Sequence, residues 1–401
     1  MTALDIDVGL TDEMQAVRDT VHRFALEVMR PAAAELDRLH DPSDVIAPGS
    51  VLWDVIQRFK QLGLGDPARY GSELSPAQRA LLHAVVLEEL SWGDVGLAIS
   101  VELCDTIAPW AQGFGKQEAY EFFSQREDIG CLALTEPDHG SDHVGFTEPI
   151  FSDPSVRPGC RARREGDEYV INGQKAAWVS NGTIATAAAL FCTLENSQHG
   201  LKGGAAFLVP LELPGVSRGK PLDKIGQRTL NQGEIFFDDV RIPDAFMLIE
   251  GPDAYAMVWE MVLKIANSAI GQQFVGVARA AFDHALAYAR ERVQGGVPII
   301  QHQSVKGRLF KMFAQVEAAR SLARRVAVAA AVSDIPYPYA AASKVFCTQT
   351  AFEVASDAVQ IFGGNGLSRE YPVEKIFRDA RAALIEDGEN DMLGLMAASR
   401  L

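Results

Sequence analysis

Cysteine is scarce in this sequence, and its spacing argues against a disulfide framework or a zinc site. The chain has five cysteines, an odd number, and none of them form a C-x-x-C pair. Among eight histidines, only His139 and His143 lie four residues apart, in a turn rich in proline and glycine, and no H-E-x-x-H motif occurs. We therefore expect buried, reduced thiols and no metal.

Long apolar runs and an excess of basic residues are also lacking. No stretch of about 18 apolar residues could cross a membrane, and residues 1–7 lack the basic and apolar regions of a signal peptide. Lys and Arg number 37 against 53 Asp and Glu, a net charge of −16, which disfavours non-specific binding to nucleic acid or acidic membranes. We expect a cytoplasmic protein with no nucleic-acid and no membrane partner.

The chain is long enough for two or three domains. Its 401 residues exceed one ordinary core, and 48% hydrophobic with 22% charged residues is typical of a soluble globular protein. Helical periodicity at both ends flanks a middle third of short strand-like segments. We predict an α+β multi-domain fold with an N-terminal α-helical domain at 1–129, a middle β-barrel or sandwich at 130–245, and a C-terminal four-helix bundle at 246–401.

Local signals place several boundaries. Thr11 is expected to cap a helix that Pro31 ends, and Ser75-Pro76 to start another. The apolar segment 95–101 is followed by Glu102, which is either an ion-pair partner or a group on a pocket floor. In the middle third, Asn172-Gly173 predicts the type I′ turn of a hairpin between residues 169–171 and 175–179.

Four acidic residues near the C-terminus follow the apolar run 382–385: Glu386, Asp387, Glu389 and Asp391. Such a cluster is usually a solvated surface. Because it follows apolar residues and contains a glycine, one carboxylate is also a candidate general base, since burial in apolar surroundings raises a carboxyl pKa.

Five motifs follow one another at characteristic spacing. They are Thr135-Glu-Pro-Asp-His-Gly-Ser-Asp142, Asn172-Gly-Gln-Lys175, Trp178-Val-Ser-Asn-Gly182, Gly226-Gln-Arg228 with Phe236-Phe-Asp-Asp-Val240, and Gly363-Gly-Asn-Gly366 with Arg378-Asp-Ala-Arg381. With these motifs in this order, the chain resembles the acyl-CoA dehydrogenase family of flavoproteins over about residues 10 to 395. The resemblance implies the same α, β, α order, bound FAD and a homotetramer or homodimer.

The resemblance also assigns site residues. It places Leu134, Thr135, Ser141, Trp178 and Ser180 beside the flavin ring. It places Arg292, Gln303, Gln360, Gly363 and Gly364 at the pyrophosphate and adenosine half of FAD, generally that of a neighbouring subunit. The substrate side is assigned to Glu102, Ser141, Arg320 and Gly388.

The family's catalytic glutamate falls on Asp387, so the sequence departs from the usual pattern at its most important position. Aspartate is one methylene shorter, roughly 1.5 Å less reach, and a misplacement of about 1 Å can cost on the order of 100-fold in rate. Branches that place the base on the first helix of the C-terminal domain offer no substitute, because residues 265–268 contain no acid. A shorter base leaves room for a branched or cyclic acyl group.

The resemblance implies FAD-dependent α,β-dehydrogenation of an acyl-CoA or acyl-carrier thioester, in which Asp387 takes the α-proton and hydride goes to flavin N5. An electron-transfer flavoprotein is a candidate acceptor. Two alternatives stay open: a flavin-dependent oxidase or non-redox elimination on a related substrate, and a catalytically silent flavoprotein partner.

Overall fold

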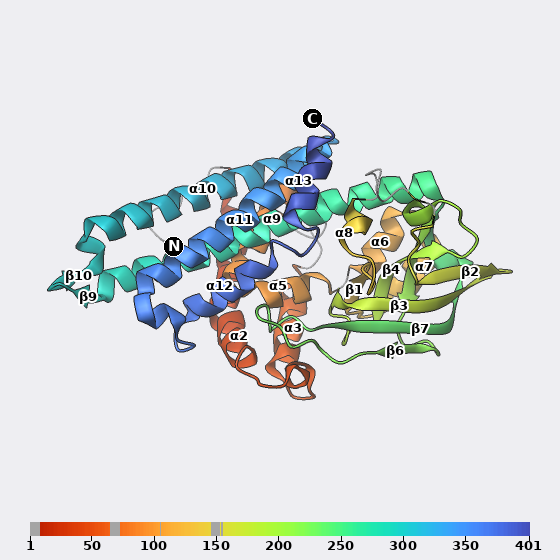
Figure 1. The fold of residues 1–401 in the computed structure, drawn as a ribbon, viewed down its shortest axis with the longest axis horizontal. Coiled ribbons are helices and arrows are strands. Elements are labelled where there is room, and N and C mark those ends of the chain that lie inside the picture. The colour runs from red at the N-terminus through yellow and green to blue at the C-terminus, as the bar shows by residue number, and fades with distance from the viewer. Residues whose placement is uncertain (1–8, 65–72, 105, 146–152, 154) are drawn as a thin grey trace. The chain divides into compact units, whose positions relative to one another are not determined.

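The computed structural model describes residues 9–64, 73–104, 106–145, 153 and 155–401 (Figure 1). The chain forms two compact units. A helical unit comprises Met1–Glu35, Pro67–Ala98 and Ala266–Leu384, and a sheet unit comprises Leu36–Asp66, Ile99–Ile265 and Ile385–Leu401. The predicted order of helices, strands and helices along the chain is confirmed. The division at residues 129 and 245 stays a prediction.

The helical unit is built from long helices with short connections. Its elements are α1 (Asp12–Phe24), the π-helical turn η1 (Ala25–Met29), α2 (Arg30–Leu36), α4 (Pro76–Gly93), β9 (Val293–Gln294), β10 (Val297–Pro298), η7 (Ile299–Gln301), α10 (Gln303–Val332), α11 (Tyr337–Phe362), η8 (Gly363–Leu367) and α12 (Pro372–Ala382). Two more helices, α5 (Val95–Glu102) and α9 (Pro252–Glu291), are divided between the units, and the last residue of α2, Leu36, belongs to the sheet unit.

Two of the predicted helix starts are confirmed by their caps. The Thr11 hydroxyl accepts a hydrogen bond from the amide of Met14, and Ser75 forms a reciprocal capping box with Gln78. The prediction that Pro31 ends the first helical stretch is wrong. The π-helical turn η1 widens the backbone just before it, with the Arg30 amide bonded to the Ala25 carbonyl, and this accommodates the proline ring inside α2.

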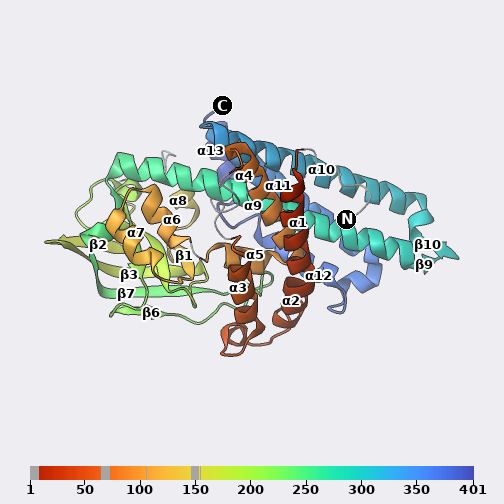
Figure 2. The same ribbon diagram turned by 180° about the vertical axis from the view of Figure 1, so that it is seen from behind.

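Helix α4 packs closely against its neighbours in the helical unit, α1 and α10 among them (Figure 2). Gly276 of α9 lies so near α4 that an added Cβ would be 2.2 Å from the Glu88 carbonyl oxygen. No side chain can occupy that space, so the close approach of α4 and α9 requires glycine at this position.

The sheet unit contains an eight-stranded mixed sheet with the strand order β6-β7-β3-β2-β4-β5-β8 and with β1 paired to β4. Pairs β1–β4 and β2–β4 are parallel and the others antiparallel. The strands are β1 (Gly130–Ala133), β2 (Arg161–Glu165), β3 (Glu168–Ser180), β4 (Ala187–Leu194), β5 (Gly204–Pro210), β6 (Val216–Arg218), β7 (Gln232–Pro243) and β8 (Met247–Glu250).

Helical segments complete the sheet unit: η2 (Pro42–Ile46), α3 (Val51–Leu62), α6 (Ile107–Gly113), α7 (Gln117–Ser124), α8 (Ser141–Val144), η5 (Gly200–Lys202), η6 (Asp244–Phe246) and α13 (Asn390–Ala398). The core of the sheet is apolar, and β5 is buried along its whole length. Each fully buried large side chain there, such as Phe207, stabilises the unit by about 1.5–3 kcal/mol. All five cysteines are buried, and none forms a disulfide.

The predicted hairpin at Asn172-Gly173 is wrong. Strand β3 runs through this dipeptide for 13 residues and pairs with β7 on both sides of it, with a register shift between Ile171 and Gly173 (Figure 1). The hairpin lies earlier, between β2 and β3, where Glu165 pairs with Glu168. The dipeptide therefore marks a bulge in a long strand, which glycine also favours.

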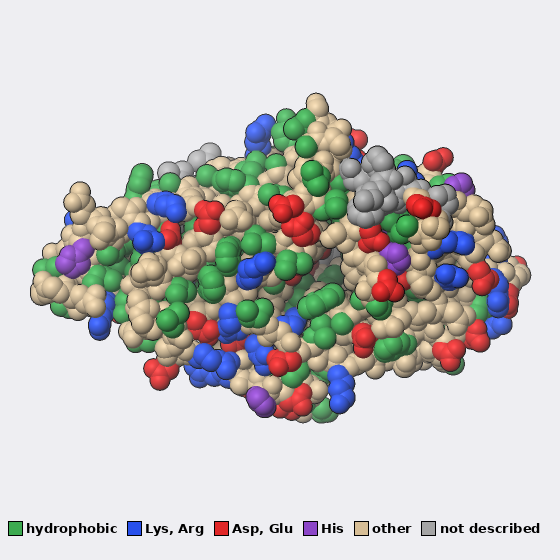
Figure 3. Space-filling model, viewed as in Figure 1, with side chains coloured by type: hydrophobic (Ala, Val, Ile, Leu, Met, Phe, Trp, Pro, Cys, Tyr) green, Lys and Arg blue, Asp and Glu red, His purple; other side chains and the backbone are tan. Residues whose placement is uncertain are grey.

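On the face drawn in Figure 3, acidic and basic side chains are interspersed, and hydrophobic side chains show between them. Among the helices that the structure describes, none has the length and apolar character needed to cross a membrane.

Candidate active site

Four of the five residues predicted to lie beside the flavin, all except Ser141, lie at or directly after the ends of β1 and β3 in the sheet unit. Leu134 and Thr135 directly follow β1. The Leu134 carbonyl accepts a hydrogen bond from Lys175 Nζ at 2.9 Å, and the Thr135 carbonyl accepts one from the Ala176 amide at 2.8 Å. Trp178 follows two residues later on β3, and its side chain is 60% exposed although it is a large aromatic. An exposed indole at the rim of a sheet can cover a planar ligand.

A buried ion pair fixes this end of β1, and the sequence reasoning missed it. Lys175 is fully buried, and its Nζ lies 2.6 Å from Glu136 Oε1. The other carboxylate oxygen of Glu136 accepts the amides of Gly159, at 2.5 Å, and Cys160, at 3.1 Å. Both charged groups of this buried pair therefore have hydrogen-bond partners besides each other, which a buried ion pair needs to be stable. The sequence carries little signal for this pair, because β3 also contains the polar residues Glu168, Asn172 and Gln174.

Ser180, at the end of β3, is held by residues that precede and begin β7. Gln232 Nε2 donates to Ser180 Oγ at 3.1 Å and to the Trp178 carbonyl at 3.3 Å. The next residue, Asn181, is buried in a left-handed conformation with φ 59°, and its amide donates to the Asn231 carbonyl. Asparagine tolerates this conformation better than most residues. The two predicted flavin contacts on β3 therefore stand on a hydrogen-bonded base.

Ser141 opens the short helix α8 and is exposed. The turn before it is closed by Asp142, which accepts the Gly140 amide at 2.7 Å and lies 2.5 Å from His139 Nδ1. His143 is buried behind this turn, and desolvation, with a smaller contribution from nearby Lys175, lowers the pKa of its imidazole to about 3. His143 is therefore neutral behind the turn, while Ser141 and Asp138 of the turn are exposed.

The acidic cluster divides into residues with different structural roles. Glu386 Oε1 accepts a hydrogen bond of 2.7 Å from Gln227 Nε2. Glu389 caps α13 by accepting the amides of Asp391 and Met392 at 3.1 and 3.0 Å, and Asp391 lies in the first turn, where a negative charge is favourable.

Asp387 lies at the apex of this turn, in the left-handed conformation with φ 52°, and is followed by Gly388 with φ 97°. Aspartate occupies that region more readily than most side chains do. Asp387 is exposed, so the apolar surroundings expected for a general base would have to come from the ligands that cover it.

The residues predicted for the other half of FAD meet in the helical unit. An open cleft of about 610 Å³ is lined by Arg292, Gln360, Gly363 and Gly364, four of the five residues predicted for this site. Gln303, the fifth, is the exposed first residue of α10 and is not among the lining residues, whereas its neighbour His302 is.

The two glycines leave the space next to their backbone in the cleft empty. A Cβ added at Gly363 or Gly364 would meet no protein atom within 4 Å, so it would project into open space at the cleft. Gly363 also has φ 61° and ψ −137°, a conformation that belongs to glycine. Together with the Arg292 guanidinium, which suits a diphosphate, this open floor fits the dinucleotide half of FAD.

An aromatic group that sequence reasoning missed supports the glycine turn. The rings of Tyr288 and Phe362 stack with centroids 4.0 Å apart, and Asn365 Nδ2 donates to the hydroxyls of Tyr288 at 3.0 Å and Tyr371 at 3.2 Å. Asn365 is the third residue of the Gly-Gly-Asn-Gly motif, and its hydrogen bonds explain the asparagine between the glycines.

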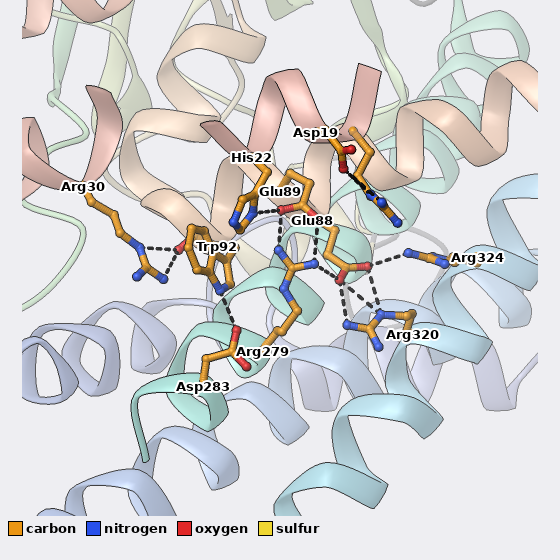
Figure 4. A network of polar contacts seen from close by, with 11 residues as sticks. Asp19, His22, Arg30, Glu88, Glu89, Trp92, Arg279, Asp283, Arg320 and Arg324 are labelled. Atoms are coloured by element: carbon orange, nitrogen blue, oxygen red, sulfur yellow. Dashed lines mark hydrogen bonds and ion pairs between the residues drawn. The ribbon is translucent and has the colours of Figure 1, made fainter. Parts of the chain in front are cut away.

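Besides Ser141, three residues were assigned to the substrate side, and their surroundings differ. Gly388 lies next to Asp387. Glu102 is the half-buried last residue of α5. Arg320 is buried in the ionic network of Figure 4, where its guanidinium lies 2.9 Å from Glu88 Oε1. Its contact with substrate stays a prediction.

Glu88 is the centre of this network in the helical unit. Arg279 and Arg324 also contact its carboxylate, at 2.8 and 3.2 Å (Figure 4). Burial alone would raise the pKa of the Glu88 carboxyl, but the guanidiniums of Arg320, Arg279 and Arg324 hold it well below its usual range. The network therefore joins α4 to α9 and α10 through charges that are matched within the unit.

Comparison with known proteins finds three matching family descriptions, in order along the chain. "Acyl-CoA dehydrogenase, N-terminal domain" matches residues 11–123, "Acyl-CoA dehydrogenase, middle domain" matches 131–240, and "Acyl-CoA dehydrogenase, C-terminal domain" matches 257–401.

Individual relatives match over nearly the full length. The chain is 32% identical over 403 residues to the mitochondrial short-chain specific acyl-CoA dehydrogenase of Rattus norvegicus, covering 98% of this chain and 91% of that one. It is 30% identical over 398 residues to the cyclohexane-1-carbonyl-CoA dehydrogenase of Geobacter metallireducens, covering 98% of both. The solved structure of butyryl-CoA dehydrogenase from Megasphaera elsdenii superposes with a TM-score of 0.84 at 28% identity, covering 98% of this chain and 99% of that chain.

Proposed function

Because this chain belongs to the acyl-CoA dehydrogenase family, whose members are FAD-dependent oxidoreductases acting on CH–CH groups, we propose that it introduces an α,β double bond into an acyl-CoA with Asp387 as the base. The observation that carries this proposal is the pair of half-sites. One is the Trp178–Ser180 end of β3, and the other is the glycine-floored cleft beside Arg292.

The residues present fit FAD. In the helical unit, Arg292 would hold the diphosphate while Gly363 and Gly364 leave room for it. In the sheet unit, Leu134, Thr135, Trp178 and Ser180 would surround the ring system. When bound, FAD supplies the acceptor for the hydride that leaves the β-carbon.

The chain's own part in the reaction is proton removal. The Asp387 carboxylate takes the α-proton, and the electron pair of the broken α-C–H bond forms the new double bond as hydride leaves the β-carbon. The substrate covers the exposed Asp387, excludes water from it and so makes the carboxylate more basic. Hydrogen bonds to the thioester carbonyl would stabilise the developing enolate.

The acyl group is proposed from the length of the base. Asp387 is one methylene shorter than glutamate, so the α-carbon must approach the turn more closely or carry a bulkier group that fills the space. A short branched or cyclic acyl-CoA meets this requirement. The similarity to relatives named for short-chain and cyclohexane-1-carbonyl substrates supports this range.

A test is to mix the purified holoenzyme anaerobically with butyryl-CoA, isovaleryl-CoA and cyclohexanecarbonyl-CoA and to follow the visible band of oxidised flavin. We expect at least one thioester to bleach it, and Asp387→Asn to slow bleaching by about 1,000-fold or more, since the variant retains shape but has no base. Full bleaching by Asp387→Asn would refute the role of Asp387. An oxidised flavin with product formed would favour the non-redox alternative, and no reaction with any thioester would favour a silent flavoprotein.

We also propose a homotetramer or homodimer. Large apolar side chains of the helical unit are exposed in the single chain, among them Phe310 at 71%, Leu367 at 78% and Phe346 at 43%. Such side chains are buried when subunits associate. Sedimentation equilibrium of the holoprotein tests this, and a monomer at all concentrations would refute it. An electron-transfer flavoprotein is the proposed acceptor, tested by its reoxidation of the reduced enzyme.

A further inference from the structure

The loop before β7, residues 222–231, is closed by its own hydrogen bonds. The Leu222 amide bonds to the Gln232 carbonyl at 2.9 Å. Lys224 Nζ donates to the Leu230 carbonyl and to Gln232 Oε1, both at 2.7 Å. These bonds bring the two ends of the loop together, so its tip is held on a fixed base.

The residues at the foot of the loop also hold the predicted flavin contacts. Gln232 uses its amide nitrogen on Ser180 Oγ and on the Trp178 carbonyl, while its amide oxygen accepts from Lys224. Asn231 adds a bond of 2.5 Å from Thr183 Oγ1 to its side-chain oxygen. A displacement of the loop and a displacement of the end of β3 are therefore coupled through Gln232 and Asn231.

Gln227 lies at the tip of this loop and reaches the turn that bears Asp387. Gln227 is only 2% exposed and its φ is 48°. Its backbone carbonyl accepts a hydrogen bond of 3.0 Å from the Leu230 amide. A left-handed glutamine is strained, so the surroundings must hold it in place. Its Nε2 lies 2.7 Å from the carboxylate of Glu386, which immediately precedes Asp387. A neutral donor on a carboxylate makes a strong, directional hydrogen bond.

We infer that Gln227 is a positioning residue: through Glu386 it fixes the turn of Asp387 relative to the strand end at Trp178 and Ser180. The inference rests on the proposed function, in which Asp387 is the base and β3 faces the flavin. A base that is one methylene short depends on the position of its backbone, because its side chain has less freedom to correct an error. A misplacement of about 1 Å can lower the rate about 100-fold.

The opposite side of the turn is held independently. Glu389 caps α13, so the four residues from Glu386 to Glu389 are tied at one end to the loop of Gln227 and at the other to a helix. The charged groups of the loop are engaged elsewhere: Arg228 bonds Asp223 and the Leu39 carbonyl. The hydrogen bond from Gln227 to Glu386 therefore links this loop to the segment that bears Asp387.

The test exchanges donor and acceptor. Gln227→Glu alone places two carboxylates at hydrogen-bond distance, where they repel. The double variant Gln227→Glu/Glu386→Gln restores one amide and one carboxylate with the same net charge as wild type. Gln227→Ala removes the donor, and Gln112→Ala, an exposed glutamine on α6 in the same unit, is the matched control.

Anaerobic stopped-flow bleaching with butyryl-CoA gives the limiting rate and the half-saturating concentration for each holoenzyme. We expect Gln227→Ala and Gln227→Glu to lower the limiting rate about 10- to 100-fold with the half-saturating concentration changed less than about threefold, and the double variant to recover most of the rate. Gln112→Ala should match wild type. A loss that the double variant does not reverse, or an unchanged rate in Gln227→Ala, would overturn the inference.

Hydrogen–deuterium exchange of the holoproteins separates this inference from the proposed function. If Gln227 holds the turn, amides at 385–392 should exchange faster in Gln227→Ala than in wild type, while amides of the sheet unit outside this turn, the loop 222–231 and the end of β3 stay unchanged. If wild-type flavin is not bleached by any thioester, the proposed function fails on that ground alone. Equal exchange at 385–392 would overturn the inference about Gln227 whatever the activity.

Discussion

Adding one methyl group at Gly363 or at Gly364 should separate the cost of backbone strain from the cost of blocking the cofactor cleft. Both glycines line the cleft, and at both an added Cβ meets no protein atom within 4 Å. Only Gly363 has a positive φ, 61°. Gly363→Ala therefore carries strain and obstruction together, while Gly364→Ala carries obstruction without strain.

The magnitudes follow from the conformations. An alanine forced into the glycine region at residue 363 should lower the free energy of unfolding by about 1–3 kcal/mol. Gly364→Ala should change the stability of the cofactor-free protein by less than about 0.5 kcal/mol, because nothing in the protein is displaced. Gly307, in the interior of α10 with open space around it, is the control, and Gly307→Ala should stabilise by about 0.5–1 kcal/mol.

The assay has two parts. Urea unfolding of cofactor-free protein measures the strain, and fluorescence titration with FAD measures the obstruction. We expect both cleft variants to bind FAD at least about tenfold more weakly, a loss of about 1.4 kcal/mol, with Gly307→Ala unchanged. If Gly364→Ala binds FAD as wild type does, the cleft is not the dinucleotide site and the assignment of Arg292 to the diphosphate fails with it.

Three further predictions concern buried charges. Lys175→Met should lower the free energy of unfolding by about 3–5 kcal/mol, because it leaves the Glu136 carboxylate buried without its cation, and Lys175→Met/Glu136→Leu should recover much of that loss in the same urea assay. Glu88 has a folded-state pKa below its unfolded value, so its stabilisation is present above about pH 4.5 and is lost as pH falls further. Glu88→Gln should flatten the acid limb of a stability–pH curve, and an unchanged limb would contradict the ionic network. His143 has a folded-state pKa near 3, below its unfolded value, so it lowers stability as pH falls below about 6.5. Burial also lowers the pKa of His83 and of His284 to about 4, so a histidine-selective NMR titration should show three imidazoles still neutral at pH 5. The neutral signal that is lost in His143→Leu assigns His143.

Regular patterns predicted the order of helices and strands, and single motifs predicted residues that the structure brings together in one cleft. Capping residues at Thr11 and Ser75 fixed helix starts because a cap satisfies backbone donors locally. The resemblance predicted that the Gly363-Gly364 turn faces the cofactor, and adjacent glycines suit that place because they let a ligand approach the backbone closely. These are features that a few neighbouring residues determine.

The failures share a different cause, because each depended on residues far along the chain. Asn172-Gly173 reads as a turn locally, but pairing with β7 carries β3 straight through it. Pro31 is accommodated by the π-helical turn at Ala25–Met29, and the residues of that turn carry no pattern that predicts it. Likewise, Gln227 meets Glu386 across 159 positions of sequence, and a lone glutamine in a loop carries no periodic signal that would predict such a contact.

The close approach at Gly276 has a consequence for how variants of this protein would be read in a genetic screen. Any larger residue there would have to force the α9 backbone away from α4, next to the Glu88 carbonyl, so substitution should abolish folding outright. In a growth assay that selects for enzyme activity, Gly276 would then score as strictly as Asp387, although it contacts no ligand in the proposed site. Measuring the amount of soluble protein alongside growth distinguishes loss of folding from loss of catalysis. Without that measurement, residues needed for helix packing would be counted as active-site residues.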